Sequence, residues 1–301
     1  MIKQIFILWF QGFDMAPDVV KTCVKSWKYY NPDWKIVLLD ANTLNQYMDI
    51  DKYITDDTGK KFTKTALSDI IRCTLLKVYG GVWVDATTFC NKPLNDWLPQ
   101  YSTEGFFAFS TPGPDRLLSS WFLYSDINNY ILDKWFNKTI EYYERNTKPH
   151  TYYWFHYLFG YLYTADNVFK EMWDNVPKLS ANRFGPHYLL KKGLFNTITP
   201  NIKLDIDTKR TPLYKLTHKA NFPEYNDTKN IYYLYSTLSP LPEVEIPETE
   251  IPETEISEVE IPEVEMSEVE IPAVKTPAVK KICRPLTPQY RMLFAMRHRR
   301  G

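Results

Sequence analysis

The 301-residue chain lacks several features that mark common protein classes. Its four cysteines, Cys23, Cys73, Cys90 and Cys283, form no Cys-x-x-Cys or Cys-x-x-His cluster, which argues against a structural zinc site. No apolar run is long enough for a signal-peptide core or a transmembrane helix. We therefore expect a cytoplasmic protein with reduced thiols.

The chain also lacks net charge, but the zero sum hides two segments of opposite sign. Residues 243–272 carry 12 Glu and no Lys or Arg, whereas residues 275–301 carry 8 Lys and Arg and no acid. The rest of the chain has 28 basic and 24 acidic residues. So small a surplus does not indicate nucleic-acid binding, and we expect no nucleic-acid partner.

A five-residue repeat begins at Glu243 and reads EVEIP ETEIP ETEIS, with Pro or Ser closing each unit. Proline at this frequency prevents helix formation and central-strand pairing, and neighbouring glutamates repel one another. The pattern predicts a globular domain over residues 1–238, a disordered Pro/Glu repeat linker over 239–282 and a basic tail over 283–301. The tail is either a solvated segment or a peripheral membrane contact.

Apolar runs and helical spacing alternate along the first third of the chain. They predict strands at residues 4–10, 34–39 and 82–84, and helices at 17–30 and 65–79. This alternation is typical of an α/β fold with a mainly parallel central sheet flanked by helices.

The remaining part of the predicted domain has weaker signals. Residues 115–175 are aromatic-rich and predicted to be helical, and residues 201–238 are predicted to form short strands and loops. In a parallel sheet, ligands bind beyond the carboxyl ends of the strands. Asp40 and Asp85 lie at two such ends, although Asp40 could simply cap a turn.

The stretch SDIIRCTLLKVYGGVWVDAT, residues 68–87, brings charged groups to the same edge. Asp69 and Arg72 share one helix face, and the following turn and strand deliver Asp85. Such a pair is often a surface salt bridge of little energetic value. A nucleotide sugar could use all three groups, because its hydroxyls suit carboxylates and its diphosphate suits a guanidinium or a metal ion.

The stretch ALSDIIRCTLLKVYGGVWVDAT resembles the donor-binding motif of glycosyltransferases with the GT-A fold. More narrowly, it resembles the capsular polysaccharide synthesis family, which is related to initiation-specific mannosyltransferases and clostridial glucosylating toxins. Three further stretches agree: IFILWFQGFDMAPDVVKTCVKSWKYYNPDW, then WFHYLFGYLY with MWDNVPKLSANRFGPHYLL, and TPLYKLTHK. The resemblance covers residues 1–220 in the expected order and implies a Rossmann-like, nucleotide-sugar-binding domain.

The resemblance implies roles for four residues. Trp9 would stack on the base of the donor, with a core tryptophan as the alternative. Asp69 would accept hydrogen bonds from the donor sugar, Arg72 would contact the sugar or diphosphate, and Asp85 would contact the ribose and the metal ion.

One position departs from the usual motif, because Thr87 replaces the second aspartate of Asp-x-Asp. The family itself often has this residue, but a hydroxyl is a weaker metal ligand than a carboxylate. We expect Mn²⁺ or Mg²⁺ to bind at Asp85, Thr87 and His218. An ordinary surface histidine is the alternative for His218, His156 could belong to the core, and His187 has no assigned role.

The implied function is transfer of a sugar from a UDP- or GDP-linked donor to a glycan or polysaccharide acceptor, with retention of anomeric configuration. A catalytically inactive nucleotide-sugar or carbohydrate-binding protein of the same fold, and a scaffold built around the repeat, are the alternatives. Similar proline-punctuated tails occur in large DNA viruses that encode glycosylation enzymes, which suggests a viral origin. The donor, the acceptor and the oligomeric state stay open.

Overall fold

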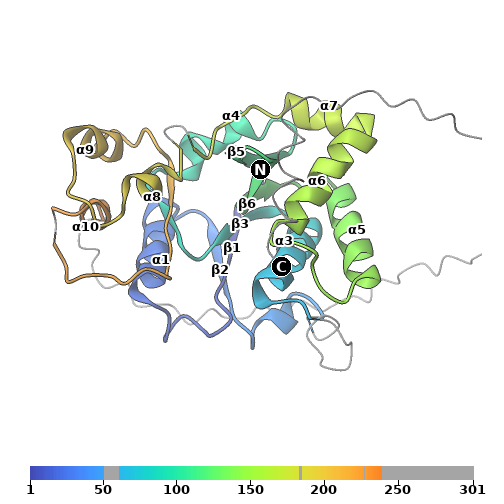
Figure 1. The fold of residues 1–301 in the computed structure, drawn as a ribbon, viewed down its shortest axis with the longest axis horizontal. Helices are drawn as coiled ribbons and strands as arrows, with labels where there is room; N and C mark the ends of the chain where they lie inside the picture. Colours follow the sequence, from blue (N-terminus) through green and yellow to red (C-terminus); the bar gives the residue numbers. More distant parts are fainter. Residues whose placement is uncertain (51–60, 183–184, 227, 239–301) are drawn as a thin grey trace, which may run out of the picture. The chain divides into compact units, whose positions relative to one another are not determined.

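A five-stranded sheet with strand order β2-β1-β3-β6-β5 forms the centre of the computed structural model (Figure 1). The structure describes residues 1–50, 61–182, 185–226 and 228–238. The predicted repeat linker and basic tail lie outside the described residues, so their assignment stays a prediction.

The first three strands of the sheet are parallel. They are β1 (Gln4–Leu8), β2 (Lys35–Leu39) and β3 (Gly81–Asp85), with β1 paired to both others. The order along the chain, with α1 and then α3 between consecutive strands, follows the predicted alternation. The expected α/β fold with a helix-flanked sheet is confirmed.

The second part of the sheet is an antiparallel hairpin. Strand β6 (Arg116–Ser125) pairs antiparallel with β3 and with β5 (Phe106–Gly113). The prediction that residues 115–175 are helical throughout is therefore wrong for β6. Nearly the whole strand is buried, so it has no alternation of polar and apolar residues that would distinguish it from a buried helix.

Helices α3 and α6 pack against the sheet, and α5 packs against both of them (Figure 1). Their bounds are Lys64–Tyr79 for α3, Tyr130–Arg145 for α5 and Trp154–Ala165 for α6, and α7 (Asn167–Asn175) follows directly. Aromatic side chains join these helices. The rings of Trp135 and Phe155, for example, stack with centroids 3.9 Å apart.

A second, two-stranded sheet lies against α1 (Asp18–Tyr30). Strand β4 (Thr88–Cys90) pairs antiparallel with β7 (Leu213–Lys215), which follows much later in the chain. The indole of Trp27 on α1 donates a 2.7 Å hydrogen bond to the carbonyl of Thr88. This sheet therefore places residues near 215 beside the strand that follows Asp85.

Short helices complete the described chain. They are η1 (Leu44–Gln46), η3 (Leu94–Asp96), α4 (Leu98–Tyr101), α8 (Tyr188–Lys192), α9 (Pro200–Asp207) and α10 (Asn230–Ser236). The expectation of only short strands and loops over residues 201–238 is thus wrong, because α9 and α10 lie there. Helix α9 begins with Thr199 as N-cap and Pro200 in its first turn, a recognisable start signal.

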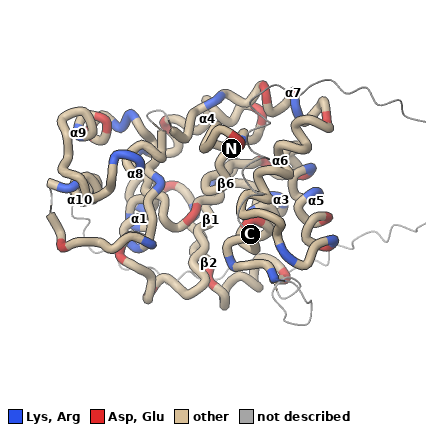
Figure 2. Tube along the Cα trace, in the orientation of Figure 1, with Lys and Arg blue, Asp and Glu red and all other residues tan. Residues whose placement is uncertain are grey.

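Two other expectations concern cysteines and hydrophobic helices. Cys23, Cys73 and Cys90 are free and buried. Among the described residues, no helix is long and apolar enough to cross a bilayer. Lys and Arg are interspersed with Asp and Glu along the described trace (Figure 2).

Candidate functional site

Helix α3 holds the first two site residues on one buried face. Its start is defined by Thr63, whose side chain accepts a hydrogen bond from the backbone N–H of Ala66, and Gly80 ends it. Asp69 and Arg72 form an ion pair whose side chains are 10% and 4% exposed. The alternative of a solvent-exposed surface pair is therefore wrong.

Asp85 completes the predicted cluster at the carboxyl end of β3. Its Oδ1 accepts hydrogen bonds of 3.1 Å from Arg72 Nη2 and 3.1 Å from the indole of Trp83. The Asp85 side chain is 31% exposed, so it can still reach a ligand. The structure thus brings Asp69, Arg72 and Asp85 together, as the sequence predicts.

Lys215 is a member of this cluster that sequence reasoning missed. Its ammonium lies 3.3 Å from Asp85 Oδ2 and donates a 2.7 Å hydrogen bond to Thr87 Oγ1. The pairing of β7 with β4 sets this contact, with Lys215 in register with Thr88. The signal that could have found it is its place in TPLYKLTHK, three residues before His218.

The two carboxylates of the site respond differently to burial. Burial alone would raise the pKa of Asp85, but the charges of Lys215 and Arg72 outweigh it and hold this pKa below its ordinary value. Burial raises the pKa of Asp69, with Arg72 opposing the shift and the negative charge of Asp85 reinforcing it. Asp85 is therefore the more firmly ionised carboxylate.

The predicted metal ligands fit a divalent cation poorly. Mg²⁺ and Mn²⁺ bind through oxygen ligands, but Asp85 Oδ2 and Thr87 Oγ1 both already contact the ammonium of Lys215. Two like unit charges about 4 Å apart repel by about 4 kcal/mol near a protein surface. Among the described residues, no group of three His, Cys, Asp or Glu side chains could hold a metal ion.

Trp9 and His218 lie together. Trp9 directly follows β1 and is partly buried, and the His218 ring stands edge-on to it with centroids 5.1 Å apart. Burial lowers the pKa of His218, and Lys219 and Lys215 lower it further. His218 is therefore a neutral ring beside Trp9 and lines the cavity described below.

Asp40 is not a free carboxylate at the sheet edge. Its Oδ1 accepts hydrogen bonds from the backbone N–H groups of Asn42 and Thr43 and from the Thr43 hydroxyl. Burial opposes its charge, but these hydrogen bonds lower the pKa of Asp40 overall. Asp40 thus caps the turn that follows β2.

His156 and His187 belong to packed surroundings. His156 stands edge-on to the rings of Tyr153 and Phe155, and burial lowers its pKa to about 3. The ring of His187 lies 5.6 Å from that of Trp121, and burial lowers its pKa to about 4. Both rings are neutral near pH 7.

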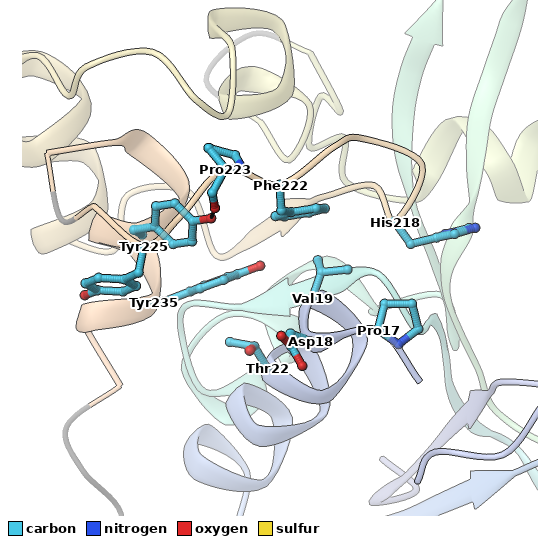
Figure 3. A pocket seen from close by; sticks show the side chains of 10 residues that line it. Pro17, Asp18, Val19, Thr22, His218, Phe222, Pro223, Tyr225 and Tyr235 are labelled. Atoms are coloured by element: carbon cyan, nitrogen blue, oxygen red, sulfur yellow. Dashed lines mark hydrogen bonds between the residues drawn. The ribbon is translucent and has the colours of Figure 1, made fainter. Parts of the chain in front are cut away.

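An aromatic-lined cavity of about 420 Å³ adjoins His218 (Figure 3). Its lining comes from α1, from the loop after β7 and from α10, and includes Val19, Thr22, His218, Phe222, Tyr225 and Tyr235. The hydroxyl of Tyr235 is buried and has no hydrogen-bond partner among the described residues. This volume is within the range of small-molecule sites.

A family model described as "Capsular polysaccharide synthesis protein" matches residues 1–235, so the chain belongs to this family. The matched region contains every residue of the cluster described above.

Two further proteins are similar over shorter spans. The O-glycosyltransferase braB of Annulohypoxylon truncatum is 26% identical over 151 residues, which is 44% of this chain and 36% of that relative. The solved structure of PaToxG Glycosyltransferase aligns with 57% of this chain and 73% of its own, at 15% identity and a TM-score of 0.39.

Proposed function

We propose that the protein is a glycosyltransferase that moves a sugar from a nucleoside-diphosphate sugar to a glycan acceptor. The observation that carries the proposal is the ion-pair network at the carboxyl end of β3, in which buried Asp69 and Arg72 join partly exposed Asp85 and Lys215. Membership of the capsular polysaccharide synthesis family and the similarity to named glycosyltransferases support glycosyl transfer.

The network provides both kinds of contact that such a donor needs. Asp69 and Asp85 can accept hydrogen bonds from sugar or ribose hydroxyls, and Arg72 and Lys215 can neutralise the diphosphate. Negative charge develops on the diphosphate as the glycosidic bond to the sugar breaks. Cations held in advance by carboxylates stabilise that charge without reorganising.

Trp9 and His218 extend the site toward the base of the donor. Trp9 is partly buried directly after β1, and the face of its indole would stack on a uracil or guanine ring. The neutral His218 ring stands edge-on to Trp9 and limits the space around that base. We extend the proposal to retention of anomeric configuration, which the family resemblance favours.

We place the acceptor glycan in the aromatic cavity beside His218. Tyrosine rings offer flat apolar faces for sugar rings and hydroxyls for hydrogen bonds. Tyr225 is 66% exposed and can present its ring to a sugar. Because His218 borders both Trp9 and the cavity, an acceptor bound there lies next to the donor.

The test is release of UDP or GDP from a panel of nucleotide sugars, with candidate glycans present. Replacing Asp85 with Asn should lower release about 100-fold or more, because it uncouples both cations from the site. The matched control is Asp33→Asn, an exposed aspartate paired with Lys3, which should leave release unchanged. Equal release by wild type and Asp85→Asn would refute the proposal.

A further inference from the structure

Lys215 occupies the place between Asp85 and Thr87 that a divalent cation would take. The backbone sets its position, because β7 pairs with β4 and the N–H of Leu216 donates a 2.8 Å hydrogen bond to the carbonyl of Thr87. Its side chain is 17% exposed, so the ammonium is largely shielded from water but can still be reached.

The ammonium is already bound by the same two oxygens that would ligate a metal. A lysine ammonium has three N–H donors. Two of them account for the contacts to Asp85 Oδ2 and Thr87 Oγ1, and no other side chain among the described residues takes the third, which is left for a ligand.

The charges of the site also balance without a metal ion. Asp69 is paired with Arg72 and Asp85 with Lys215, so two carboxylates face two cations. A second aspartate at position 87 would add a negative charge that one ammonium could not balance. The neutral hydroxyl of Thr87 suits an ammonium, as it accepts a hydrogen bond without adding charge.

We propose that Lys215 replaces the divalent cation, and that its ammonium binds the diphosphate of the donor directly. The inference rests on the proposed function, since it names how the same site binds a nucleoside diphosphate. Arg72 holds the other oxygen of Asp85, so the carboxylate positions one cation on each side of the site.

The test measures binding of UDP and GDP to the full chain by calorimetry, once in EDTA and once in an excess of Mn²⁺ of about 1 mM. We expect the wild-type Kd to agree within about twofold between the two conditions. Lys215→Met should weaken binding in EDTA by about tenfold or more, since a charge-assisted hydrogen bond is lost. Lys215→Arg, which keeps the charge, should weaken it less.

A gain of metal dependence is the sharpest variant. Lys215→Asp supplies a second carboxylate beside Asp85 and Thr87, so its nucleotide binding should be weak in EDTA and recover in Mn²⁺. Wild-type binding that disappears in EDTA, or Lys215→Met binding that equals wild type in EDTA, would overturn the inference and leave the proposed function standing. Absence of UDP and GDP binding to the folded wild type in both conditions would overturn the proposed function and the inference together.

A second readout does not depend on any variant folding. The paramagnetic resonance signal of free Mn²⁺ should not decrease when wild-type protein is added, because Lys215 already holds the two ligand oxygens. Stoichiometric loss of that signal would contradict the proposal.

Discussion

Asp85 contacts a different cation with each carboxylate oxygen. Arg72 Nη2 lies 3.1 Å from Oδ1, and Lys215 Nζ lies 3.3 Å from Oδ2. Arg72 is further fixed by the carboxylate of Asp69 and by the Ser68 hydroxyl at 3.2 Å. Each of these side chains thus holds its neighbour in place, so substitutions here should affect both folding and ligand binding.

We predict that the protein becomes less stable when Arg72 loses its buried partner Asp69. Asp69→Ala should lower the free energy of unfolding by about 3 kcal/mol, because the guanidinium is 4% exposed and keeps a charge that water cannot reach. Asp69→Asn retains the side-chain volume and a hydrogen-bond acceptor, so it should cost less. Urea unfolding monitored by circular dichroism measures both, and equal losses for the two variants would contradict the expectation.

A second residue-scale prediction separates acceptor from donor binding. Tyr225→Ala should raise the KM for the glycan acceptor several-fold, since aromatic contacts contribute about 1 kcal/mol each, while donor KM stays unchanged. The matched control is Tyr161→Ala on α6, where the tyrosine is 55% exposed and lies outside the cavity lining. Initial-rate kinetics with each substrate varied would check this prediction. A changed donor KM in Tyr225→Ala would show that the cavity binds the donor instead of the acceptor.

At the scale of elements, the turn from α3 into β3 fixes where Asp85 lies. Gly81 has φ +89°, and a Cβ there would lie 2.6 Å from the carbonyl oxygen of Gln4 on β1. We predict that Gly81→Ala lowers the free energy of unfolding by about 2 kcal/mol or more, since the strained backbone and the collision add. Gly160→Ala in α6 is the control, because its added Cβ would meet no described atom within 4 Å outside its own stretch of helix, and it should stabilise slightly. Thermal unfolding of both variants measures these changes in stability and tests the prediction.

Helix α6 should make the fold sensitive to acid. Burial lowers the pKa of His156 to about 3, below its ordinary value near 6.5, so the folded chain binds this proton less readily than the unfolded chain. The stabilising effect of the neutral ring is therefore fully present above pH 6.5 and is lost as pH falls toward 3. The stability lost by pH 5 is about 2 kcal/mol.

The variant that tests this effect is His156→Phe, which cannot titrate and suits neighbours such as Tyr153 and Phe155. It should lose less stability than wild type between pH 7.5 and pH 5. Parallel losses in the two proteins, measured by urea unfolding, would show that other groups cause the acid sensitivity.

Local signals explain which elements could be predicted from the sequence. Strands β1, β2 and β3 and helices α1 and α3 have clear apolar periods and end signals, and the structure has them within a few residues of the predicted bounds. Strand β6 was mistaken for helix because burial on both faces removes its alternation. Lys215 was missed because its partner Asp85 lies 130 residues earlier, and only the pairing of β4 with β7 brings them together.

At the scale of the whole molecule, the family match and the described structure end close together. The match stops at residue 235 and the described chain at residue 238. We predict that removing residues 239–301 changes the rate of sugar transfer by less than about twofold, since every site residue identified in the described chain comes before residue 239. Transfer assays on 1–238 and 1–301 check this, and loss of transfer in the shorter chain would favour the scaffold alternative built around the repeat.

The central claim is that this site transfers a sugar and does more than bind a nucleotide. The most direct measurement incubates the wild-type chain with one nucleotide sugar and a glycan acceptor, and follows both products by mass spectrometry. The account predicts equal amounts of nucleoside diphosphate and of a glycan heavier by one sugar residue, with both reduced about 100-fold or more in Asp85→Asn. Tight donor binding by the wild type, with neither product across the donor and acceptor panels, would contradict it and identify a nucleotide-sugar-binding protein instead.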